Sequence, residues 1–136
     1  SCYCIVGTCD RLSRPGEAEN VITVGSMDKS LVNADVSSGG NTADGRVKPD
    51  VSAVGVRSSV AGNDGTVSRA NGTSFASPTF CGLVACFWQA CPWLTATEVI
   101  DSVRRSADRA DAPDKIDGYC VSNLWNAYQK EFKQRP

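Results

Sequence analysis

Residues 69–85 read RANGTSFASPTFCGLVA and place one hydroxyl, that of Ser74, between small polar residues and a long apolar run. From Phe80 to Cys91 nearly every residue is apolar, which predicts a helix buried on every side. Pro78 has no backbone N–H to donate to the Ser74 carbonyl, so we expect a loosened first turn. The stretch therefore predicts a serine at the amino-terminal end of an interior helix.

Local physics leaves two interpretations of Ser74 open. The unpaired N–H groups and the positive dipole end of a helix N-terminus stabilise anions, including the oxyanion of acyl transfer. Gly72, Ala76 and Ser77 are small and leave room for a ligand backbone nearby. The alternative is a serine or threonine that acts only as the N-cap of a core helix.

Strands are expected before this helix, and further helices after it. The helix should end before Pro92, and Thr95 with Glu98 has the spacing of a capping box that opens a second helix. We expect strands at 3–6, 21–24 and 51–56, a hairpin of 56–62 and 66–70 around the turn 63–65, and a third helix from Ser122. The residues expected to face inward are Val99, Ile100, Val103 and Ala107 in the second helix and Leu124, Trp125, Ala127, Tyr128 and Phe132 in the third. Residues 133–136 are expected to form a frayed tail.

The composition excludes several classes of protein. A chain of 136 residues with 41% hydrophobic residues fits one globular domain or a piece of one. The net charge of −1, with acids and bases interspersed, does not indicate a nucleic-acid or anionic-membrane partner. No apolar stretch is long enough to cross a bilayer, and residues 1–12 lack the features of a signal peptide.

Seven cysteines and no histidine limit the metal and redox chemistry. Cys81, Cys86 and Cys91 recur every five residues, and each step turns a helix by about 140°, so they make a poor metal site. No CxxC pair is present, and we expect free, mostly buried thiols and no metal site. No acidic cluster has the pattern of a calcium loop.

The lack of histidine also means that no imidazole of this chain can serve Ser74 as a base. A lysine base is a weaker alternative, because Lys48 and Lys115 stand in polar loops with no sign of burial. The aspartates at 10, 28, 44, 50 and 64 are interpreted as loop or turn acids.

The segment NGTSFASP (71–78) closely resembles the nucleophile motif of the subtilisin-like serine proteases, the subtilases, G-T-S-x-[AS]-x-P. Gly72, Thr73, Ser74, Ala76 and Pro78 match it. Four other segments resemble family segments in the same order, so that the likeness covers residues 20–132: NVITVGSMD (20–28), GRVKPDVSAVGV (45–56), PWLTATEVIDSVRRSA (92–107) and DGYCVSNLWNAY (117–128). Cys120 stands where the family usually has glycine.

The resemblance implies an α/β fold in which strands of a largely parallel sheet precede a buried central helix and two further helices. It gives Ser74 the role of nucleophile, with its own N–H in the oxyanion hole, for peptide-bond hydrolysis through an acyl-enzyme. The family's D-[ST]-G and H-G-T motifs are absent. Residues 1–136 are therefore expected to be one partial domain, the C-terminal half of a catalytic domain, inactive without an N-terminal half.

The resemblance also suggests weaker assignments near the start of the chain. If Gly7 aligns with the glycine of the family's A-[AS]-G-N-[DE]-G stretch, Thr8 replaces the oxyanion-hole asparagine as a less fixed donor, with Ile5, Val6 and Gly7 along the primary specificity pocket. Alternatively, CIVGTCD (4–10) is a divergent strand. Calcium is frequent in the family and most members are exported, so an extracytoplasmic location is expected.

A second hypothesis is non-enzymatic: a degenerate subtilase half that serves as a binding or regulatory module. In either case a partial sheet leaves an exposed edge and an apolar face, so we expect self-association. The substrate of the enzymatic alternative would be a peptide or protein.

Overall fold

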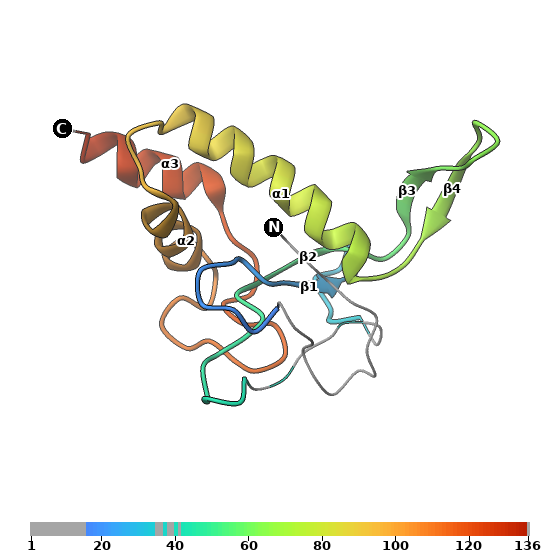
Figure 1. The fold of residues 1–136 in the computed structure, drawn as a ribbon, viewed down its shortest axis with the longest axis horizontal. Coiled ribbons are helices and arrows are strands. Elements are labelled where there is room, and N and C mark those ends of the chain that lie inside the picture. The colour runs from blue at the N-terminus through green and yellow to red at the C-terminus, as the bar shows by residue number, and fades with distance from the viewer. Residues whose placement is uncertain (1–15, 35–36, 38–39, 41, 136) are drawn as a thin grey trace.

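The computed structural model describes residues 16–34, 37, 40 and 42–135, and the expected strand at 3–6 lies outside them (Figure 1). The described part is mixed α/β, as predicted. Its elements are β1 (Val24–Met27), β2 (Val51–Val54), β3 (Ser58–Ala61), β4 (Val67–Ala70), α1 (Thr73–Ala90), α2 (Ala96–Arg105) and α3 (Leu124–Lys133). None of these helices combines the length and the apolar character that a bilayer span requires.

Strands β1 and β2 pair in parallel, with Val24 opposite Val51. The expected strand 21–24 is wrong in its bounds, because β1 begins at Val24 and continues through Gly25 to Met27. Gly25 does not end the strand: a Cβ there would lie 2.6 Å from Ser52 Oγ on β2. The glycine therefore permits the close approach of the two strands.

The hairpin predicted around 63–65 is confirmed. Strands β3 and β4 pair antiparallel, and Gly65 in the turn has a φ of 79°. Figure 1 shows the hairpin projecting from the body of the molecule just before α1.

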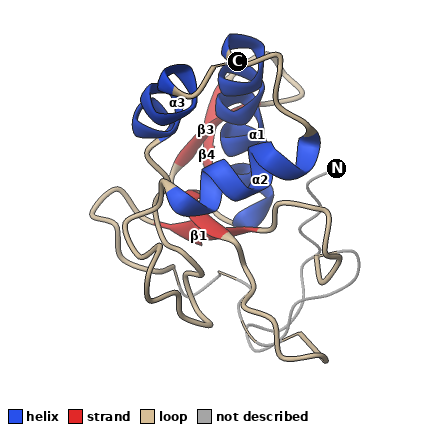
Figure 2. Cartoon of the chain, turned by 90° about the vertical axis from the view of Figure 1, so that its left-hand side faces the viewer, coloured by secondary structure: helices blue, strands red, loops and turns tan. Residues whose placement is uncertain are grey.

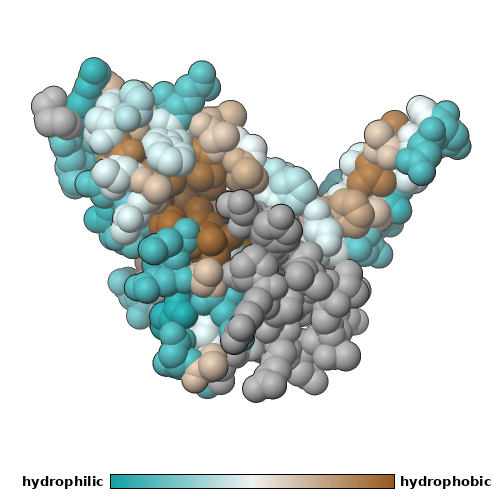
Figure 3. Space-filling view, viewed as in Figure 1, coloured by the Kyte–Doolittle hydropathy of each residue, from teal (hydrophilic) through white to brown (hydrophobic). Residues whose placement is uncertain are grey.

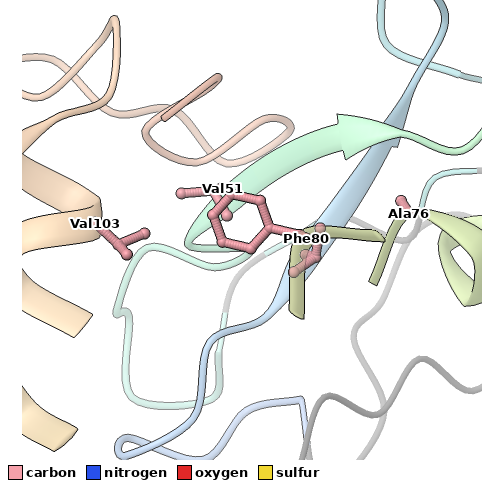
Figure 4. Packing of buried hydrophobic residues seen from close by; sticks show 5 residues of the cluster. Val51, Ala76, Phe80 and Val103 are labelled. Atoms are coloured by element: carbon pink, nitrogen blue, oxygen red, sulfur yellow. The ribbon is translucent and has the colours of Figure 1, made fainter. Parts of the chain in front are cut away.

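Helix α1 packs one face on β1 and β2. A core cluster joins Val24 and Val51 of the strands, Ala76 and Phe80 of α1, and Val103 of α2 (Figure 4). Figure 2 shows the helices on one side of the strand pair and long loops on the other.

The expectation that α1 is buried on every side is wrong for this chain. Cys81, Leu83, Cys86 and Trp88 are exposed, while Phe80 and Phe87 are buried. Among the described residues, the strands and α3 cover only one side of the helix. Figure 3 shows apolar surface in the middle of the molecule, where α1 crosses it.

Helix α2 forms as its sequence predicts. Thr95 and Glu98 make the reciprocal capping box, and Val99, Ile100, Val103 and Ala107 are buried. A second core cluster, of Phe87, Cys91, Leu94, Val99 and Ala127, joins α1, α2 and α3.

Helix α3 departs from the prediction in its start and in its inward face. It begins at Leu124 with Asn123 as N-cap, and the inward placement of Trp125 and Phe132 is wrong. Trp125 is 65% exposed and stacks on Tyr128, because the narrow contact of α3 with the other helices is taken by Ala127. The helix runs to Lys133, the first residue of the expected tail.

Candidate functional site

The amino-terminal end of α1 is capped by backbone alone. Gly72 occupies the N-cap position with a φ of 143°, which favours glycine, and no side chain supplies a capping hydrogen bond. The carbonyl of Gly72 accepts hydrogen bonds from the N–H groups of Phe75 (3.1 Å) and Ala76 (3.4 Å). The alternative that a serine or threonine caps this helix is therefore wrong.

Ser74 is the second residue of α1, and its side chain is exposed. Its hydroxyl makes no hydrogen bond with any other described residue. The N–H groups of Phe75 and Ala76 are bonded to Gly72, whereas those of Thr73 and Ser74 have no acceptor among the described residues, so they leave free donors and a positive partial charge beside the serine. The structure thus places a free hydroxyl in an environment that stabilises anions.

A close backbone approach fixes the turn that precedes Ser74. The Gly72 N–H donates to the Gly55 carbonyl at 2.9 Å. A Cβ on Gly55 would lie 2.5 Å from the Gly72 carbonyl oxygen, closer still to Ser26 Oγ, and 3.0 Å from the Ala76 Cβ. Only glycine fits at position 55 without displacing this turn. Gly55 was not among the predicted site residues, although it lies in the segment 45–56 that resembles the family.

The small residues of the motif pack beside the contact between Gly55 and Gly72. Thr73, Ala76 and Ser77 are buried, and Pro78 is exposed within the helix. Ser77 Oγ is buried without a hydrogen-bond partner among the described residues. Within the motif, the Ser74 side chain is thus exposed beside closely packed, buried neighbours.

Asp50 lies in the bend before β2, as its interpretation as a loop or turn acid expected, but it is not a solvent-exposed acid. Its carboxylate is 1% exposed and accepts hydrogen bonds from Lys48 Nζ (2.6 Å), from Arg104 Nη2 (2.6 Å) and Nε (2.9 Å), and from the Thr23 N–H (2.7 Å). This carboxylate joins the start of β2 to α2 and to the segment before β1. The sequence feature that could have indicated this buried carboxylate is the triplet Lys48-Pro49-Asp50.

Lys48 is also buried, contrary to expectation. Its ammonium donates to Asp50 and, at 2.9 Å, to the Val21 carbonyl. Burial lowers the pKa of Lys48, and the hydrogen bond to Asp50 opposes this shift. Because the ammonium is committed to these acceptors, Lys48 is not a free base for Ser74.

The other described acids of the sequence analysis do lie in loops or turns. Asp28 accepts hydrogen bonds from its own loop, and Asp64 from Thr66. The Thr42 hydroxyl and the Arg46 guanidinium lower the pKa of exposed Asp44 to about 2. Among the described residues, no group of three or more acids or cysteines is arranged to hold a metal ion.

The four described cysteines are free, but the expectation of mostly buried thiols is wrong for two of them. Cys81 and Cys86 are exposed on α1, Cys120 is half-buried, and Cys91 is buried. Burial raises the pKa of the Cys91 thiol. The assignments to Ile5, Val6, Gly7, Thr8 and Asp10 lie outside the described residues.

Comparison with known proteins decides the family. The sequence profile of the subtilase family matches residues 6–120.

The chain belongs to the subtilase family.

Solved subtilase-like proteases share its fold. The self-cleaved protease domain of PatA matches with a TM-score of 0.73 and 25% identity, over 90% of this chain and 45% of that one. The Clostridium perfringens CspB protease matches with a TM-score of 0.79 and 24% identity, over 91% of this chain and 29% of that one. MycP1 with its N-terminal propeptide removed matches with a TM-score of 0.67 and 25% identity, over 85% of this chain and 38% of that one. This subtilase chain thus spans less than half the length of each of these three structures.

Proposed function

We propose that this chain supplies the nucleophile of a subtilisin-like serine endopeptidase. Ser74 Oγ would attack the carbonyl carbon of a peptide bond while a base takes its proton; the C–N bond would then break, and the amine would leave with that proton. Water would hydrolyse the acyl-enzyme ester, which releases the carboxylic acid and restores the serine hydroxyl. The observation that carries the proposal is the exposed, unbonded Ser74 hydroxyl in the first turn of α1.

The backbone around Ser74 supports this role. The N–H of Ser74 belongs to the first turn of α1 and would donate to the oxyanion of the tetrahedral intermediate. Thr8 is proposed as the second donor. Loss of one such donor costs on the order of 10²–10³ in turnover, so a threonine in place of asparagine would reduce the rate.

The general base must come from elsewhere, because the chain contains no histidine. A companion N-terminal segment that carries aspartate and histidine would complete the site, cover the exposed face of α1 and line the substrate cleft. Without it, the chain is expected to be inactive and to self-associate. Export from the cytoplasm is proposed because most members of the family are exported.

A fluorophosphonate probe tests the proposal on the isolated chain, with Ser74→Ala as the control. Slow labelling that Ser74→Ala abolishes is the expected result. Rapid labelling without any added segment would contradict the predicted inactivity. Labelling that is unchanged in Ser74→Ala would remove Ser74 as the nucleophile.

The alternative of a non-catalytic binding or regulatory module is favoured by the lack of histidine and by the threonine proposed at the oxyanion-hole position, Thr8. The genomic sequence upstream of the Ser1 codon distinguishes the two. In-frame D-[ST]-G and H-G-T motifs favour the protease, and a start codon next to Ser1 favours the module.

A further inference from the structure

A pocket at the base of the β3–β4 hairpin has no role in the chemistry proposed for Ser74. It has a volume of about 370 Å³. Its lining comes from the loop after β1 and from both ends of the hairpin: Asp28, Lys29, Ser30, Val56, Arg57 and Arg69.

The pocket is positively charged. None of its three cations, Lys29, Arg57 and Arg69, forms an ion pair with a carboxylate of the described residues. The acid among the described lining residues, Asp28, uses Oδ1 to accept the N–H groups of Ser30 (2.7 Å) and Val32 (3.0 Å) in its own loop. Within this described lining, three cations against one carboxylate leave an excess of two positive charges.

The hairpin holds the side chain of Arg69, and a hydrogen bond to Asn71 fixes the backbone of Arg57. Arg69 Nη1 donates to the Arg57 carbonyl (2.9 Å) and to Ser59 Oγ (2.8 Å). Arg57 has a φ of 55°, an uncommon conformation for a residue with a long side chain, and its N–H donates to Asn71 Oδ1 at 2.7 Å. Strained backbone of this kind occurs frequently at ligand-binding positions.

The same contacts connect the pocket to the turn that carries Ser74. Asn71, which holds Arg57, stands three residues before Ser74. One residue further, Gly72 is bonded to Gly55, which precedes the hairpin. Figure 1 shows the hairpin leaving the molecule beside the first turn of α1. The pocket and the first turn of α1 are therefore joined by short hydrogen-bonded connections through Asn71 and Gly72.

We propose that this pocket binds an acidic side chain of a peptide. A carboxylate matches the planar donor fork of an arginine, and Lys29 adds a further donor. That the peptide is also a substrate rests on the proposed function, whereas the binding itself does not. The inference therefore assigns a preference for aspartate or glutamate at one subsite away from the scissile bond.

Binding is measured by calorimetry with the Ser74→Ala chain, so that turnover plays no part. The probes are two acetylated and amidated hexapeptides, Ala-Ala-Glu-Glu-Ala-Ala and Ala-Ala-Gln-Gln-Ala-Ala. Exposed ion pairs contribute about 0.2–1 kcal/mol each, so contacts with three cations should favour the glutamate peptide by about tenfold. In about 1 M salt, where the Debye length is about 3 Å, this preference should nearly disappear.

The variant that tests the assignment is Lys29→Gln/Arg57→Gln. Neither side chain makes a hydrogen bond within the described residues, so their loss leaves the fold intact. The matched control is Lys130→Gln/Lys133→Gln on α3, which removes the same charge from a distant element (Figure 1).

The pocket variant should reduce the preference to less than about threefold, as expected when two of the three ion pairs are lost, and the α3 control should leave it unchanged. Equal affinity for the two peptides, or no binding of either, would overturn the proposal. So would an equal reduction in both variants, because it would show a general effect of net charge. Fluorophosphonate labelling of Ser74 is a separate readout, so failure of the protease proposal leaves this result interpretable.

Discussion

Replacing Asp50 with asparagine should destabilise the fold more than any exposed charge change in this chain. Asparagine keeps the shape of the side chain but removes the charge that faces Lys48 and Arg104. Lys48 is 1% exposed, so its ammonium would remain buried with neutral acceptors and no carboxylate to balance its charge. Breaking a buried ion pair by removing one partner costs about 3–5 kcal/mol. Urea unfolding followed by circular dichroism measures this loss.

The control for this prediction is Asp44→Asn. Asp44 is 57% exposed and pairs with Arg46 on the surface, so its loss should cost less than about 1 kcal/mol. Adding Lys48→Met to Asp50→Asn should recover about 1 kcal/mol or more, because it removes the uncompensated buried charge. If Asp50→Asn costs no more than Asp44→Asn, the reasoning about the buried charge is refuted.

The pH dependence of Asp50→Asn provides a second check. Burial lowers the pKa of Lys48 in the folded state below 10.5, and the variant loses the contact that opposes this shift. Between the folded pKa and 10.5 the unfolded state binds more protons, so stability rises with pH. The variant should therefore gain stability relative to the parent chain as the pH rises toward 10.5.

Three further results are expected. Gly55→Ala should lower the free energy of unfolding in urea by about 1–3 kcal/mol, because the new methyl group overpacks against the turn before α1. Gly82→Ala, which has open space around it, should raise this free energy by about 0.5–1 kcal/mol. An unchanged stability of Gly55→Ala would contradict the close approach of Gly55 and Gly72. Hydrogen bonds from the Thr95 backbone and hydroxyl lower the pKa of Glu98 from 4.5, so its stabilising effect is present above pH 4.5 and is lost as the pH falls through the lower folded value. A carboxyl ¹³C titration should show this depression, and Thr95→Ala should reduce it without abolishing it, because the variant loses the hydroxyl donor but keeps the backbone N–H. Iodoacetamide should modify exposed Cys86 rapidly and buried Cys91 slowly, because burial also raises the pKa of the latter thiol; equal rates would count against the burial.

The sequence by itself determined the features that depend on neighbouring residues. The capping box of Thr95 and Glu98, the glycine-containing turn of the hairpin and the end of α1 before Pro92 all formed where they were predicted. Each depends on hydrogen bonds or dihedral angles within a few residues, so local chemistry was sufficient. The GTSFASP motif likewise predicted the family, because its residue types match over a short, fixed spacing.

The tertiary structure alone decided burial. Lys48 and Asp50 read as loop residues, and only the packing of α2 against β2 brings Arg104 to the same carboxylate. The same reason explains the errors on α1 and at Trp125: an apolar side chain is buried only where another element covers it. Apolar periodicity shows which face a helix can bury, and the arrangement of distant segments decides which face it does bury.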